Sequence, residues 1–172
     1  RKNVPRLIEA YALLAPDVRS RCMLVIVGGR GWRGQKEDIL HRVALHGLQE
    51  HVRILDYVND QLLTRLYADS RFLVMPSLYE GFGLPVVEAN RHGVPALVGS
   101  GGSLPEVGGD AALVVDPLDT ESIRSGLERL ILDDKLRSAL AVNAIRNAAR
   151  FSWPAAARQL LGLFDELAAA RA

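Results

Sequence analysis

The stretch with the clearest chemistry is the segment 76–88, which reads Pro-Ser-Leu-Tyr-Glu-Gly-Phe-Gly-Leu-Pro-Val-Val-Glu. The apolar run 71–75 before it predicts a buried strand, and Pro85 predicts a helix from about Leu84 because proline suits the first helical turn. The backbone amides of residues 81–84 then have no acceptor within the helix. An open helix N-terminus of this kind favours binding of a phosphate group.

Two glutamates flank this turn: Glu80 lies in the loop and Glu88 lies about one turn into the predicted helix. A carboxylate repels phosphate, but it accepts hydrogen bonds at two oxygens and so matches two neighbouring hydroxyl groups of a sugar or a ribose. Stabilisation of the helix N-terminus also explains Glu88, but it does not explain Glu80, which precedes the helix. A ligand with hydroxyl groups on both sides of its phosphates satisfies both glutamates, and the residues therefore indicate a nucleotide sugar.

This pattern resembles the Glu, seven residues, Glu motif of the retaining GT-B glycosyltransferases of family 4. Further segments in the order and spacing of that family extend the resemblance over nearly the whole chain: 1–3, 27–29, 93–95, 103–107, 110–112 and 151–153. The resemblance implies a two-domain enzyme whose C-terminal half binds the donor, and this chain resembles that half alone. We therefore expect the first strand of this half, and an N-terminal domain that binds the acceptor, to lie outside the chain.

The resemblance also implies a role for each candidate site residue. Glu80 is the expected catalytic residue and holds hydroxyl groups of the donor sugar, Glu88 holds the ribose diol, and Lys2 holds the diphosphate. The other expected donor contacts are Val58 at the nucleobase, Gly28 and Gly29 beside the ligand, and Gly81, Phe82, Gly83 and Leu84 through their backbone amides.

The implied reaction is retaining transfer of a sugar from a nucleotide diphosphate sugar to a saccharide or lipid acceptor. The similarity leans toward mannosyltransferases that use GDP-mannose. No Asp-x-Asp pair of the type that holds a metal on a diphosphate occurs in the sequence. We therefore expect binding without a metal or other cofactor, with Lys2 and helix N-termini balancing the phosphate charge.

A second motif favours a different function. Residues 29–34 read Gly-Arg-Gly-Trp-Arg-Gly between a predicted strand and a predicted helix, and Asp56 ends the next strand, as in a nicotinamide dinucleotide-binding domain. Trp32 and two arginines crowd this loop, and this interpretation leaves Glu80 and Glu88 without a role. It therefore stands as an alternative, together with a GT-B-type nucleotide-sugar epimerase. A receiver-type module would need aspartates at the strand ends, and the strand ends Val27-Gly28, Met75-Pro76 and Val98-Gly99 carry none.

Strand-like and helix-like segments alternate along the chain, which predicts a Rossmann-like α/β fold with a parallel sheet, helices on both faces and a helical C-terminal tail. The predicted strands are 22–27, 52–55, 71–75, 95–98 and 113–115, and residues 99–103 are expected to form a flexible turn. The predicted helices are about 3–14, with Asn3 as its cap, 36–46, 59–68, from 84, 120–132, 134–149 and 153–170.

Length and composition set broader limits. The 172 residues, of which 49% are hydrophobic and 24% charged, suffice for one core, so we interpret residues 1–172 as a single domain. A formal charge of +1 without a long basic run argues against a nucleic-acid partner. The single cysteine, Cys22, fits a reducing cytoplasm, and no apolar run approaches the ~20 residues of a membrane span. We expect a cytoplasmic protein, at the membrane surface only through the N-terminal domain outside the chain.

Overall fold

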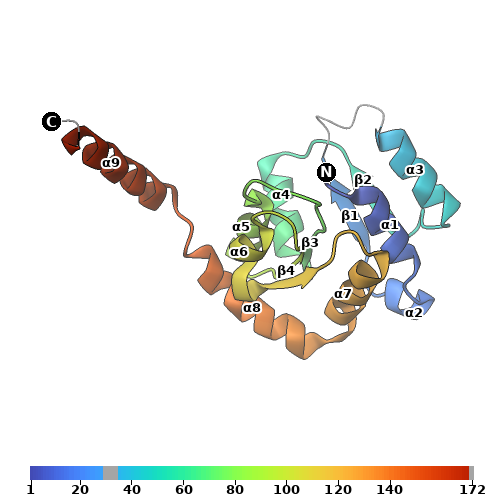
Figure 1. Ribbon diagram of the computed structural model, residues 1–172. Helices are drawn as coiled ribbons and strands as arrows, with labels where there is room; N and C mark the ends of the chain where they lie inside the picture. The colour runs from blue at the N-terminus through green and yellow to red at the C-terminus, as the bar shows by residue number, and fades with distance from the viewer. Residues whose placement is uncertain (29–34, 171–172) are drawn as a thin grey trace.

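The computed structural model describes residues 1–28 and 35–170. In these residues the strands form two parallel sheets (Figure 1). In one sheet, β1 (Leu24–Val27) pairs with β2 (Val52–Leu55). In the other, β4 (Ala96–Gly99) lies between β3 (Leu73–Met75) and β5 (Ala112–Val115). The parallel pairing confirms the predicted α/β class, although the alternation predicted one sheet where the described residues form two.

The predicted helices are present, with shifts of one or two residues at most ends. The helices are α1 (Val4–Ala12), α2 (Pro16–Arg19), α3 (Gln35–Leu45), α4 (Asp60–Ala68), α5 (Leu84–Arg91), α6 (Leu104–Gly108), α7 (Thr120–Leu132), α8 (Asp134–Ala148) and α9 (Trp153–Ala169), with a 3-10 turn at Gly109–Ala111. The short helices α2 and α6 were not predicted. Both carry a proline in the first turn, which is the signal that the sequence offered for them.

Side-chain caps fix the starts of several helices. Asn59 Oδ1 accepts a hydrogen bond of 2.9 Å from the amide of Leu62, and Asp119, Asp133 and Ser152 cap α7, α8 and α9 in the same way. Asn3 occupies the N-cap position of α1, as predicted, but it does not cap the helix through its side chain. Its backbone has a φ of 59°, and its side chain makes no capping bond to α1. The side-chain amide group of Asn3 instead donates to the backbone carbonyls of Pro76, at 3.0 Å, and Pro117, at 2.7 Å.

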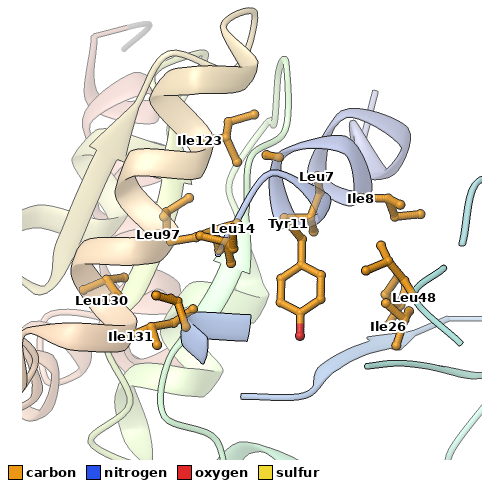
Figure 2. Packing of buried hydrophobic residues seen from close by; sticks show 14 of the residues in the cluster. Leu7, Ile8, Tyr11, Leu14, Ile26, Leu48, Leu97, Ile123, Leu130 and Ile131 are labelled. Atoms are coloured by element: carbon orange, nitrogen blue, oxygen red, sulfur yellow. The ribbon is translucent and has the colours of Figure 1, made fainter. Parts of the chain in front are cut away.

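Two apolar clusters place helices on both faces of the strands. In β4, Leu97 belongs to the first cluster, whereas Ala96 and Val98 belong to the second, because successive side chains of a strand point to opposite faces. Figure 2 shows the first cluster, in which the side chains of α1 lie between those of β1 and α7. The labelled residues are Leu7, Ile8, Tyr11, Leu14, Ile26, Leu48, Leu97, Ile123, Leu130 and Ile131.

The second cluster anchors α5, the helix that follows the glutamate loop. Val86 and Val87 of α5 are buried against Met75, Val98 and Leu104. Complete burial of each such side chain contributes about 1.5–3 kcal/mol. The start of α5 is therefore held at the ends of β3 and β4.

Helix α9 differs from the others because none of its residues is buried. It extends away from the sheets (Figure 1). Its large apolar side chains Leu160, Leu161, Leu163, Phe164 and Leu167 are all more than half exposed. Among the described residues, no helix combines the length and the apolar character that a membrane crossing requires.

Candidate functional site

The glutamate loop runs from the end of β3 to the start of α5. Pro76 and Ser77 are buried directly after the strand, and Gly83 precedes the helix with a φ of 100°. This left-handed backbone conformation favours glycine, and a Cβ atom there would also lie 2.7 Å from Leu104 Cδ2, so the Leu104 side chain would have to shift. Pro85 lies in the first turn of α5, as predicted.

The backbone amides of residues 81–84 form the open N-terminus that the sequence indicated. None of them donates a hydrogen bond to another described residue. Gly81, Phe82 and Leu84 are exposed. A free row of amides at the positive end of a helix dipole attracts an anion.

Glu80 is only 7% exposed, and the ammonium of Lys2 lies 2.8 Å from its Oε1 atom. Burial opposes ionisation of this carboxyl, but the ammonium of Lys2 and the charge of Arg1 outweigh it and hold the pKa of Glu80 below its usual value. The nearby Ser77 hydroxyl also lowers the pKa of Glu80. Within residues 1–28 and 35–170, neither Glu80 Oε1 nor this buried hydroxyl has a hydrogen-bond partner of regular geometry. Buried oxygens of this kind favour a polar ligand.

The first residues of the chain reach Glu80 because they are bonded to the loop. The Arg1 carbonyl accepts a hydrogen bond of 3.0 Å from the amide of Leu78. The Asn3 side chain bonds the carbonyls of Pro76 and Pro117. These bonds join segments that are more than 70 residues apart, so the local sequence could not reveal them.

A second loop supports the first, and the sequence analysis missed this role. Residues 99–103 were expected to be a flexible turn, but they pack against the backbone of the glutamate loop. The Ser103 hydroxyl donates to the carbonyls of Phe82, at 2.8 Å, and Glu80, at 3.1 Å. A Cβ atom at Gly102 would lie 2.5 Å from the Glu80 carbonyl oxygen. The clustered glycines were the available signal, because glycine permits backbones to approach closely.

Glu88 lies in a different environment, between α4 and α5. The Tyr67 hydroxyl donates a hydrogen bond of 2.8 Å to Glu88 Oε2, and the Tyr67 ring stacks on His92 with centroids 5.9 Å apart. These three side chains help to line a hollow of about 240 Å³. A neighbouring hollow of about 680 Å³ surrounds the first turns of α4, and the two share Asp60 and Thr64. Sequence reasoning identified Glu88 but not Tyr67.

The remaining candidate residues lie at the carboxyl ends of β1 and β2. The Gly28 amide donates to the Leu55 carbonyl at 3.1 Å, and half-buried Val58 lies between β2 and α4. Val58 lines neither hollow, and no described contact joins it or Gly28 to the two glutamates. Gly29 and the rest of the glycine loop 29–34 lie outside the described residues. Asp56, the acidic residue of the alternative motif, forms an ion pair of 2.7 Å with Lys36.

These sequence and structural features can be compared with known proteins. A family model described as "Glycosyl transferases group 1" matches residues 1–147. The chain belongs to this family. It is 40% identical, over 168 residues, to O-antigen chain mannosyltransferase B of Escherichia coli, a match that covers 97% of the chain and 43% of the relative. The chain therefore spans less than half the length of this glycosyl transferase. The family assignment does not favour the alternative of a nicotinamide-binding domain.

Solved structures agree on the fold. Sucrose-phosphate synthase from Thermosynechococcus elongatus superposes with a TM-score of 0.85 at 26% identity, over 99% of this chain and 43% of that one. Anabaena Alr3699/HepE in complex with UDP and glucose superposes with a TM-score of 0.82 at 22% identity, over 94% and 44%. The chain of this group 1 family member thus has the fold of one half of a GT-B glycosyltransferase.

Within the described ranges 1–28 and 35–170, no three His, Cys, Asp or Glu side chains come close enough together to hold a metal ion. The positive groups that the described residues place at the glutamate loop include Lys2, beside Glu80, Arg1, whose charge also acts on Glu80, and the N-terminus of α5.

Proposed function

We propose that this chain is the donor-binding half of a retaining glycosyltransferase and binds a nucleotide diphosphate sugar. Glu80 binds hydroxyl groups of the sugar at the reaction centre, and Glu88 binds the ribose diol. The amides of residues 81–84 and the ammonium of Lys2 bind the diphosphate between them. The family resemblance adds Val58 at the nucleobase and Gly28 and Gly29 beside the ligand as proposed contacts.

The observation that carries the proposal is the placement of two carboxylates on either side of an open helix N-terminus. The amides of residues 81–84 suit an anion, whereas the carboxylates suit hydroxyl groups. The buried oxygens of Ser77 and Glu80 that lack hydrogen-bond partners support a hydroxyl-bearing ligand at the Glu80 end. The two hollows along α4 offer space for a nucleoside at the Glu88 end. A nucleotide diphosphate sugar presents these groups in the same order.

Two finer parts of the proposal concern the donor and the acceptor. The E. coli relative is named a mannosyltransferase, which favours a mannose donor and, by the resemblance stated above, GDP-mannose. The acceptor, a saccharide or a lipid, binds to a part of the enzyme outside this chain. The GT-B epimerase alternative uses the same donor, and the two are separated by adding acceptor: a transferase consumes the acceptor, whereas an epimerase changes the donor without it.

The two glutamates provide the test of the donor assignment. Glu88→Ala should weaken binding of GDP or UDP roughly 10- to 150-fold, because it removes a charge-assisted hydrogen bond to the ribose. Glu80→Ala should leave binding of the free nucleotide almost unchanged and weaken binding of the nucleotide sugar. Titration calorimetry with both ligands measures these affinities. Glu50 is an exposed glutamate before β2, and Glu50→Ala is the matched control. It should change neither the affinity for the nucleotide nor the affinity for the nucleotide sugar.

An equal loss of nucleotide affinity in the Glu80 and Glu88 variants would contradict the assignment of sugar and ribose ends. Tight binding of NAD or NADP in place of GDP and UDP would contradict the donor class itself.

A further inference from the structure

The Glu88 carboxylate has one oxygen in a fixed contact. The Tyr67 hydroxyl donates a hydrogen bond of 2.8 Å to Oε2. A carboxylate accepts about two hydrogen bonds at each oxygen, so two positions on Oε1 and one on Oε2 have no donor among the described residues. Two of these three positions suit the two neighbouring hydroxyl groups of a ribose.

Tyr67 is itself held in place from the opposite side. It lies on α4, half-buried, and its ring stacks at an interplanar angle of 13° on His92, which ends α5. Burial first, and then the hydrogen bond to Glu88, raise the pKa of the Tyr67 phenol. The phenol therefore remains a neutral donor over the physiological pH range and cannot repel the carboxylate.

We infer that Tyr67 is a positioning residue that orients the Glu88 carboxylate toward the 2′- and 3′-hydroxyl groups of the donor ribose. This inference rests on the proposed function, because it assumes that Glu88 binds the ribose. Tyr67 does not contact the reacting atoms. It acts through Glu88, and it joins α4, which borders both hollows, to α5, which carries the glutamate.

The physical reason is the flexibility of a glutamate side chain. A partly exposed Glu on a helix samples several rotamers, and a ligand that needs one of them must supply the free energy of ordering. The hydrogen bond from Tyr67 selects one carboxylate orientation before the ligand arrives. Its contribution should therefore appear as selectivity for the ribose hydroxyl groups and not only as general stability.

The test compares ribose selectivity with and without the Tyr67 hydroxyl. The full chain and its Tyr67→Phe variant are titrated with GDP, 2′-deoxy-GDP and 3′-deoxy-GDP, and UDP with its deoxy analogues forms a second series. For the unsubstituted chain, loss of one hydroxyl group should weaken binding about 10-fold. For Tyr67→Phe, GDP should bind about 3- to 10-fold more weakly, and the penalty for each deoxy analogue should fall to about 3-fold or less.

Tyr11→Phe is the matched control, because it also removes one partly buried phenol hydroxyl. Tyr11 donates a hydrogen bond of 2.6 Å to the Cys22 carbonyl in the first apolar cluster, away from α4 and α5. The Tyr11→Phe substitution should lower the melting temperature and leave nucleotide affinity and ribose selectivity unchanged. The pair of variants thus separates a positioning role from a loss of stability.

A second variant tests whether Tyr67 acts through Glu88. When Glu88 is already alanine, Tyr67→Phe should cause no further loss of GDP affinity. A further loss equal to that in the unsubstituted chain would overturn the inference, and so would full retention of the deoxy penalty in Tyr67→Phe. If the unsubstituted chain binds neither nucleotide, or if Glu88→Ala has no effect, the proposed function fails as well. If Glu88→Ala weakens binding and Tyr67→Phe does not, only the inference about Tyr67 fails.

Discussion

The two glutamates of the site are placed in contrasting surroundings. Glu80 is nearly buried and is paired with a cation, Lys2, whereas Glu88 is partly exposed and is paired with a neutral phenol, Tyr67. A diphosphate that binds to Lys2 would compete with Glu80 for the ammonium. Under the proposed function, donor binding at the Glu80 end would exchange one ionic contact for another, whereas at the Glu88 end it would add hydrogen bonds to a carboxylate that Tyr67 already contacts.

The substitution Glu80→Gln should change how stability depends on pH. In the fold the pKa of Glu80 is lowered from 4.5, so its ionised form stabilises the native state above about pH 4.5, and this contribution is lost as pH falls through the lowered pKa. The glutamine variant has no such contribution. The difference in unfolding free energy between the two proteins should stay constant from about pH 7 to 5 and shrink at lower pH. Urea unfolding across this range measures it, and a difference that is the same at about pH 3.5 as at pH 7 would contradict the ion pair.

Helix α5 connects the site to the rest of the fold through buried polar bonds. The amide group of Asn147, on α8, donates to Asn90 Oδ1 on α5 at 2.7 Å and to the Val107 carbonyl at 2.8 Å. Asn90 in turn donates to the Val94 carbonyl at 2.9 Å. These bonds fix α5 relative to α6 and α8, and so they help to hold the helix that carries Glu88.

Asn147→Ala should lower the unfolding free energy by about 1–3 kcal/mol, because it leaves the buried oxygens of Asn90 and Val107 without their donor. Asn143→Ala is the matched control on the same helix. Its amide donates to the Asp110 carbonyl at 3.0 Å in an exposed position, so its loss should cost less than about 0.5 kcal/mol. Chemical denaturation of both variants gives the comparison. Equal losses of unfolding free energy in the two variants would show that burial of the hydrogen bond between Asn90 and Asn147 adds no stability.

Elements with local signals were predictable from the sequence. The bounds of β2 and α7 agree with the predicted ranges 52–55 and 120–132. What failed depends on contacts between distant segments. Asn3 looks like a helix cap, yet its acceptors lie 73 and 114 residues away, and two carbonyl bonds there replace one capping bond.

The candidate site shows the same difference between features with a local sequence pattern and features that depend on distant segments. The glutamate loop was recognisable because its glycines, proline and glutamates are contiguous in the sequence. Two of its supports were not, because the Ser103 hydroxyl, which bonds the loop, and Tyr67, which bonds Glu88, come from other parts of the chain. Lys2 was identified only through the family resemblance. A residue that positions another carries no local pattern of its own.

For the whole molecule, the charge balance at the site predicts donor binding that needs no divalent metal. In the proposed complex the diphosphate would meet the Lys2 ammonium and the N-terminus of α5, which provide positive potential without an ion. Addition of EDTA should leave the affinity for GDP and for the nucleotide sugar unchanged within about 2-fold. A 10-fold loss that magnesium or manganese restores would contradict this prediction.

Lys2→Ala should weaken the binding of both GDP and the nucleotide sugar. Lys36→Ala, which removes the ion pair with Asp56, is its matched control.

Helix α9 predicts how the whole molecule responds to truncation. None of its residues is buried, whereas Phe151 just before it packs edge-on against Phe82 of the glutamate loop, with centroids 5.6 Å apart. Removal of residues 153–172 keeps this contact and should change the unfolding free energy by less than about 0.5 kcal/mol, with nucleotide affinity unchanged.

Phe151→Ala in the full chain provides the contrast. Loss of its ring from the Phe82 contact should weaken nucleotide binding, because the amides of residues 81–84 lose a support that truncation retains.

Removal of α9 also removes its exposed leucines and Phe164, so the truncated chain should self-associate less in sedimentation experiments. A loss of more than about 1 kcal/mol on truncation would show that α9 packs on the sheets in solution, because an unpacked helix cannot contribute that much to unfolding of the rest.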